Sequence, residues 1–174
     1  MDTLTPSAVS AQLRELAANA DKYSLIGCIA DLIEHAMIQL PRRPSAYLDV
    51  AQAIVAAARD WARGVNEHMA VAKILPENKS YSAAWYCYLA AHQLADACEL
   101  REEMVVDCLT GAAEYVRDAI FVARGRGEKG DIAWDKEALW QIARLADLHK
   151  EEHLPPLGPR LRNSLLTARL SLAL

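Results

Sequence analysis

Two histidines and a glutamate close to the end of the chain have the spacing of a zinc site. His149, Glu152 and His153 match the pattern HxxEH, in which histidines one helical turn apart bind zinc and the glutamate acts as a base. Pro155 and Pro156 end the helix directly after His153. Charged side chains are ordinary in the last turn of a helix. These three residues are the metal candidates of the chain, but we expect a solvated helix end there and no bound metal.

Three glycines upstream match a phosphate-binding pattern. Gly125, Gly127 and Gly130 fit GxGxxG. That pattern binds a dinucleotide where a strand precedes it and a helix begins at its end. Here a long helical pattern precedes it. We therefore interpret the glycines as a connection between two helices, where glycine is common, and expect no cofactor.

A stripe of aromatic and polar side chains is the surface best suited to binding a partner. At about 100° per residue, Tyr81, Trp85, Tyr88, His92 and Asp96 share one side of a central helix. Tyrosine and tryptophan give large, stiff contact areas and are enriched at binding hot spots. The interpretation that we favour is a packed helix flank with His92 paired to Asp96, since aromatic residues at helical spacing are usually packing residues.

Three polar residues interrupt the apolar side of an earlier helix. Asp31, Glu34 and His35 lie among the residues of that helix that should face the interior. A polar pocket shared with Arg59 or Asp60 of the next helix would account for them. Charged side chains elsewhere are expected on solvated helix faces, among them Arg117 and Arg144.

Helix-period apolar stripes, each closed by Pro or Gly, run through the chain, and no strand pattern separates them. The expected helices, seven or eight in number, span about residues 6–20, 24–40, 45–62, 66–75, 82–100, 101–123, 131–154 and 157–174. In the seventh helix the residues expected to face the core are Leu139, Ile142, Ala143, Ala146 and Leu148.

Alanine dominates these stripes, and the chain has a single phenylalanine. Small side chains let helices approach closely, so Gly111, which costs about 1 kcal/mol relative to alanine inside a helix, should lie against a neighbouring helix. We predict one all-α domain over residues 1–174: an irregular bundle with an Ala-rich core over 6–154 and no sheet. The last helix, 157–174, would be peripheral or would form a homo-oligomer.

Charge and cysteine content limit the function. A net charge of -4 and a pI near 5.7 disfavour nucleic acid and anionic membranes, which require a basic face. The longest uncharged run, 80–95, is too short to span a bilayer. The four cysteines lack a CxxC pair and predict buried, reduced thiols in a cytoplasmic protein.

Short segments of the middle third match a known type of protein. The run ARDWARG at 58–64, AAW at 83–85 with Ala90 and Ala91, and AAEYVRDA at 112–119 resemble Ala-rich helical immunity proteins of bacterial polymorphic toxin systems. The similarity covers residues 23–123. It implies a cytosolic helical protein that binds and neutralises a toxin without chemistry of its own, and it supplies no contact residues.

The sequence therefore predicts a non-catalytic protein-interaction module, with an immunity protein as the leading candidate. The alternative is a small-ligand binder or metal-dependent enzyme with a pocket inside the bundle. That pocket would use His35, His92 or the pair His149 and His153.

Overall fold

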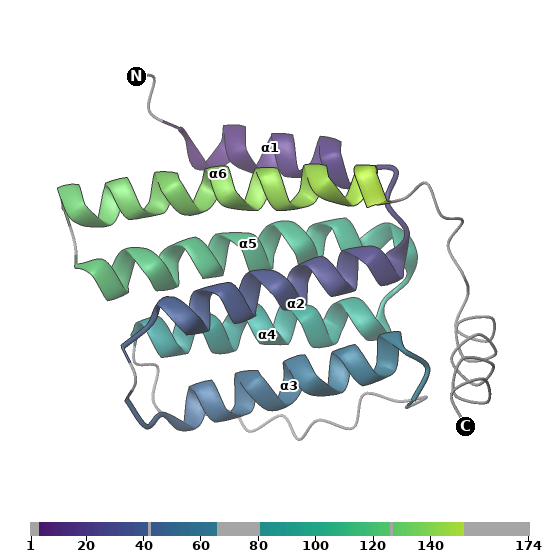
Figure 1. The fold of residues 1–174 in the computed structure, drawn as a ribbon, viewed down its shortest axis with the longest axis horizontal. Coiled ribbons are helices and arrows are strands. Elements are labelled where there is room, and N and C mark those ends of the chain that lie inside the picture. Colours follow the sequence, from purple (N-terminus) through teal and green to yellow (C-terminus); the bar gives the residue numbers. More distant parts are fainter. Residues whose placement is uncertain (1–3, 42, 66–80, 126, 152–174) are drawn as a thin grey trace, which may run out of the picture.

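A computed structural model describes residues 4–41, 43–65, 81–125 and 127–151 of the 174-residue chain, with side chains up to 148. Within these ranges it contains six α-helices and no strand (Figure 1). The helices are α1 Pro6–Ala17, α2 Lys22–Gln39, α3 Ala46–Ala62, α4 Ala83–Glu99, α5 Glu102–Arg124 and α6 Glu128–Glu151. The predicted all-helical class is confirmed for this part of the chain. The helices predicted at 66–75 and 157–174 lie outside it.

Side-chain caps fix where several of these helices begin. The hydroxyl of Thr5 accepts a hydrogen bond from the backbone of Ala8, and Pro6 occupies the first turn of α1. Asp21 caps α2, so this helix begins before the predicted start at residue 24. Helix α6 also begins earlier than predicted, at Glu128 and not at the expected cap Asp131 or Asp135.

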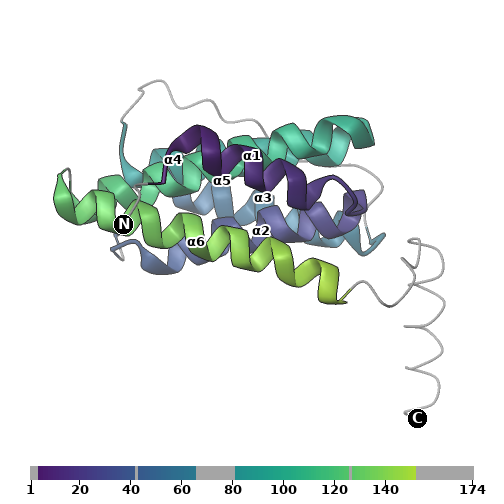
Figure 2. The same ribbon diagram turned by 90° about the horizontal axis from the view of Figure 1, so that it is seen from above.

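The six helices run roughly along the long axis of one bundle (Figure 2). In Figure 1, α1 and α6 lie along one side and α3 along the opposite side, with α2, α4 and α5 between them. The central helix α5 contacts α1, α2, α4 and α6, and α2 contacts α3, α4, α5 and α6. A side chain of α2 can therefore meet both α3 and α6.

Close approach between α4 and α5 depends on small residues. Buried alanines line both helices: Ala90, Ala91, Ala95 and Ala97 on α4, and Ala112, Ala113 and Ala119 on α5. A Cβ atom at Gly111 of α5 would lie 3.0 Å from Oε1 of Gln93 on α4. The expectation that a neighbouring helix packs against Gly111 is confirmed.

The glycines between α5 and α6 serve the chain reversal. Gly125 and Gly127 have φ values of 89° and 96°, which favour glycine. A Cβ at Gly130 would lie 2.5 Å from the carbonyl oxygen of Gly125 and 2.8 Å from the ring of Phe121. The interpretation of the GxGxxG pattern as a helix-to-helix connection is confirmed.

The predicted core face of α6 is wrong by a partial turn. Leu139 is 57% exposed and Ala143 is exposed, whereas Leu148 is buried as predicted. The buried face instead includes Glu137 and Gln141. Apolar periodicity could not select this face, because the polar residues on it are buried through hydrogen bonds to other helices.

All four cysteines are unbridged and buried, as predicted. Burial raises the pKa of Cys28, Cys87 and Cys98 to about 12 and also raises that of Cys108. In the part of the chain that the structure describes, every helix is too short or too polar to cross a membrane.

Candidate functional site

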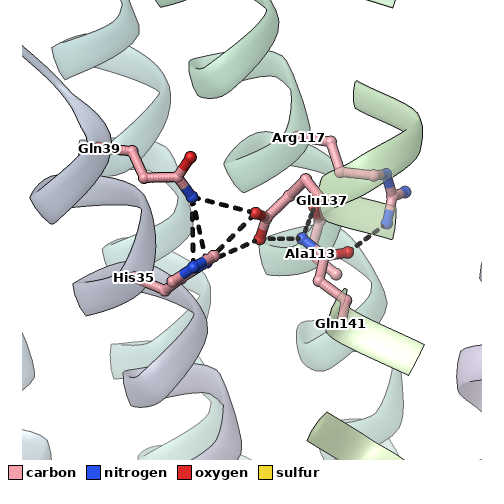
Figure 3. A network of polar contacts seen from close by, with 6 residues as sticks. All are labelled: His35, Gln39, Ala113, Arg117, Glu137 and Gln141. Atoms are coloured by element: carbon pink, nitrogen blue, oxygen red, sulfur yellow. Dashed lines mark hydrogen bonds and ion pairs between the residues drawn. The ribbon is translucent and has the colours of Figure 1, made fainter. Parts of the chain in front are cut away.

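Helices α2 and α6 bring a histidine and a glutamate together. Nδ1 of His35 lies 3.2 Å from Oε2 of Glu137, and Nε2 of Gln39 donates to the same oxygen at 3.4 Å. His35 and Gln39 are one turn apart on α2, so both point across to α6 (Figure 3). The Glu137 side chain is only 2% exposed, whereas that of His35 is 31% exposed. The glutamate is therefore an interior group that the histidine connects to the surface.

A second glutamine holds the other side of the carboxylate. Nε2 of Gln141 donates to Oε1 of Glu137 at 3.3 Å and to the carbonyl oxygen of Ala113 at 3.1 Å. Its Oε1 accepts from Nη1 of Arg117 at 2.7 Å. Because Arg117 can only donate, the amide of Gln141 has one possible orientation. The chain of contacts in Figure 3 thus links the buried arginine of α5 to Glu137 and His35.

Burial dominates the electrostatics of this network. It raises the pKa of Glu137, and His35 and the glutamine hydrogen bonds oppose that shift. It lowers the pKa of Arg117, a fully buried residue whose charge is supported by Glu114, Asp118 and Glu137. The guanidinium carbon also lies 4.9 Å from the ring centroid of Trp134, a cation–π distance.

The His35 end of the network opens into a pocket of about 440 Å³. We call it the α2–α6 pocket; its lining residues are His35, Gln39, Arg124, Lys129, Ile132, Ala133, Lys136, Glu137 and Trp140. The rings of His35 and Trp140 stack with centroids 3.7 Å apart and an interplanar angle of 16°. The volume lies within the usual range for small-molecule sites, and an apolar wall with a few converging polar groups is typical of them.

No family model, curated protein or solved structure matches this chain. Its function must therefore be inferred from the chemistry of its own residues.

A second polar cluster joins three helices. Oδ1 of Asp31 on α2 accepts from Nη2 of Arg59 on α3 at 2.7 Å, and Oδ2 accepts from Nη2 of Arg144 on α6 at 2.7 Å. Arg59 also donates to Glu34. The predicted polar contact between α2 and Arg59 is confirmed, whereas Asp60 lies beside Arg63. This cluster is a structural connection, since neither its aspartate nor its arginines line the α2–α6 pocket.

The structure separates the residues of the predicted aromatic stripe. Tyr81 is 65% exposed, Trp85, His92 and Asp96 are half-buried, and Tyr88 is only 1% exposed. The Tyr88 ring contacts the rings of Trp85 and His92 and that of Tyr47 on α3; the centroid distances are 5.3, 4.4 and 5.7 Å. Tyr88 therefore offers no surface to a partner, and Trp85 and Tyr88 pack against Tyr47 of α3 as a helix flank.

The metal candidates cannot be placed in the same way. His149 belongs to α6, but its side chain and the residues Glu152 and His153 lie outside the described part of the chain. Among the side chains that are described, no group of three His, Cys, Asp or Glu residues has the arrangement of a metal site.

Sequence analysis missed Glu137, Gln141, Trp140 and Arg117. The expectation that Arg117 and Arg144 lie on solvated faces is wrong, because one is fully buried and the other is half-buried against Asp31. A helical face drawn through Trp134, Ala138, Gln141 and Leu145 would have located the polar network. Such a search has to admit polar residues to the buried face.

Proposed function

We propose that this protein binds a small molecule in the α2–α6 pocket. The observation that carries the proposal is the convergence of His35, Gln39 and Glu137 on the aromatic wall made by Trp140. These groups come from two helices that are far apart in sequence. A preformed pocket with a few fixed polar groups lowers the cost of ordering on binding.

The contacts of Glu137 favour binding over catalysis. Its two oxygens already accept from His35, Gln39 and Gln141, so the carboxylate is held by protein donors on both sides. The pocket-lining residues that the structure describes include no serine, threonine or cysteine that could act as a nucleophile. The groups left for a ligand are the partly exposed rings of His35 and Trp140 and the exposed side chains that line the same pocket.

The network behind the pocket gives it a fixed shape. Gln141 is oriented by Arg117 and Ala113, and it in turn holds Glu137. A selective binding site requires that the residues touching the ligand are held in place by residues behind them, as Glu137 is held by Gln141. We expect the pocket to keep its geometry in the absence of ligand.

A thermal-shift screen with a library of small metabolites tests this proposal. A ligand present at a hundred times its Kd should stabilise the protein by about 2.7 kcal/mol, which corresponds to roughly 5–10 °C for a chain of this length. Ala133→Phe, which fills the pocket, should abolish the shift. Ala143→Phe, at an exposed position of the same helix, should retain it. Equal shifts in both variants, or no stabilising ligand for the wild type, would contradict the proposal.

A protein partner, with an immunity protein as the leading candidate, is the second proposal. Tyr81, which is 65% exposed just before the start of α4, supports it, as does the resemblance to toxin-neutralising proteins; a cytoplasmic location belongs to the same proposal. Binding of a cognate toxin should fall at least about tenfold with Tyr81→Ala. It should be unchanged with Ile38→Ala, which removes another exposed large side chain, from α2. If both Tyr81→Ala and Ile38→Ala bind the toxin as tightly as the wild type, the surface around Tyr81 is excluded as the binding site.

A further inference from the structure

We propose that the ligand of the α2–α6 pocket is an organic anion, with its charged group at the rim and its apolar body against Trp140. This inference rests on the proposed function of the pocket. The rim is formed by three cationic residues: Arg124, Lys129 and Lys136. Among the lining residues that the structure describes, the buried Glu137 is the only carboxylate.

The charge at the rim of the pocket is opposite in sign to the net charge of the protein. The chain carries a net charge of -4, yet the exposed charged residues that line this pocket in the described part of the chain, Arg124, Lys129 and Lys136, are cationic. Local charge of one sign over low-dielectric walls concentrates ligands of the opposite sign. A pocket with this rim should attract anions although the molecule as a whole repels them.

The position of Lys129 is the least expected of the three. A cation suits the last turn of a helix, which accounts for Arg124 without any ligand. Lys129 instead lies in the first turn of α6, where Glu128 and Asp131 suit the helix dipole and a positive charge does not. Lys136 follows two turns later and lines the same pocket. An anion bound at the rim would offset the unfavourable position of Lys129.

Charges are segregated across α6. Its carboxylates Asp131 and Asp135 line a different depression of about 320 Å³ beside Asp118, together with Trp134. Lys129 and Lys136 of the same helix line the α2–α6 pocket, where the buried Glu137 is the α6 carboxylate. The exposed Asp131 and the half-buried Asp135 thus lie at one depression and these two lysines at the other.

The floor and walls of the pocket suit an anion with an apolar body. Both oxygens of Glu137 already accept hydrogen bonds from His35, Gln39 and Gln141, and these donors partly offset its repulsion of an incoming anion. Ile132 is 48% exposed and lines the pocket beside Ala133 and Trp140. Covering this apolar surface would add to the binding free energy. Aryl carboxylates and aryl phosphates combine the two features.

The test compares matched anionic and neutral probes by titration followed in the indole ¹H–¹⁵N signals. The panel pairs 2-naphthoate with 2-naphthamide, and phenyl phosphate with phenol. We expect each anion to shift the Trp140 signal and to bind about tenfold more tightly than its neutral partner. Raising the ionic strength should reduce the preference. Lys129→Gln and Lys136→Gln should each weaken anion binding by about threefold to fivefold.

Arg101→Gln is the matched control for the lost charge. This exposed arginine precedes the opposite end of α5, and the 23 residues of that helix place it about 35 Å from the pocket rim. It should leave binding unchanged. If neutral probes shift Trp140 as strongly as the anions do, the anion inference is overturned while the pocket remains a ligand site. If no member of the panel shifts Trp140, both proposals are overturned.

Discussion

Nδ1 of His35 lies 3.2 Å from Oε2 of Glu137, although 102 positions separate the two residues in sequence. The contact joins the second helix of the bundle to the sixth and places an acid–base pair at the wall of a pocket. The carboxylate is buried whereas the imidazole is half-buried, so the histidine is the more solvent-exposed member of the pair. Much of the protein's dependence on pH should originate here.

Replacing Glu137 with glutamine should make stability less sensitive to pH. Burial raises the pKa of Glu137 above its ordinary value near 4.5. Between the pKa of the unfolded chain and that of the native state, the native state therefore binds more protons than the unfolded state. The wild type therefore loses stability as pH rises through that window. The stability of Glu137→Gln relative to wild type should increase by up to about 1.4 kcal/mol per pH unit there and then level off.

Urea unfolding of both proteins from pH 4 to pH 8 measures this difference. Asp118, whose pKa is also raised by burial, contributes equally to both proteins and cancels. A variant that becomes progressively less stable than wild type as pH rises would contradict the prediction. That result would mean that the pair with His35 lowers the pKa of Glu137 more than burial raises it.

Asp31 should matter more than an ordinary surface carboxylate. It accepts hydrogen bonds from Arg59 and Arg144 and so joins α2 to α3 and α6. Because all three side chains are partly exposed, we expect Asp31→Ala to lower the free energy of unfolding by about 1–2 kcal/mol. The matched control is Asp107→Ala, which removes the exposed pair between Asp107 and Arg14 and should cost less than about 1 kcal/mol. Equal losses in chemical denaturation would show that the bridge adds no stability.

Two glycine-to-alanine substitutions should have opposite effects. A Cβ at Gly130 would collide with the backbone of Gly125 and the ring of Phe121, so Gly130→Ala should destabilise the protein by about 1–3 kcal/mol. A Cβ at Gly27 of α2 would meet no atom within 4 Å. Gly27→Ala should therefore stabilise the protein by about 0.5–1 kcal/mol through helix propensity. Thermal unfolding of the two variants measures both effects, and a tolerated alanine at Gly130 would show that the turn relaxes.

The thiols should be unreactive in the folded protein. Burial raises the pKa of Cys28, Cys87 and Cys98 to about 12 and also raises that of Cys108. Thiolate is the reactive form, so a disulfide reagent such as Ellman's at pH 8 should modify none of the four within minutes. All four should react once the protein is unfolded in guanidinium chloride. Rapid modification of any one in the native state would contradict its buried, protonated state.

The bundle and its α4–α5 hairpin could be predicted because apolar residues at helical spacing decide them. The burial of the cysteines and the close packing at Gly111 follow from the same pattern. The contact between Asp31 and Arg59 could also be predicted, because polar residues within an apolar stripe need a partner on the next helix. Each of these inferences uses information local to one or two helices.

The α2–α6 pocket could not be predicted in this way. Glu137 and Gln141 are polar residues whose burial depends on Arg117, Ala113 and His35, which belong to other helices. A search for apolar periodicity assigns both residues to the surface. It therefore predicts that the wrong side of α6, with Leu139 and Ala143, faces the core. Only the packing of α6 against α2 and α5 shows that Glu137 and Gln141 find hydrogen-bond partners on these helices.

The four tryptophans allow the central claim to be tested in one spectrum. Trp140 lines the α2–α6 pocket, Trp134 lines the depression with the three aspartates, Trp85 belongs to the aromatic stripe and Trp61 packs on Tyr23. Each indole N–H gives its own ¹H–¹⁵N signal, which a Trp→Phe variant assigns. The ligand that most stabilises the protein in the metabolite screen should shift the Trp140 signal and leave those of Trp61 and Trp85 in place. A shift confined to Trp134 or Trp85 would contradict ligand binding in the α2–α6 pocket.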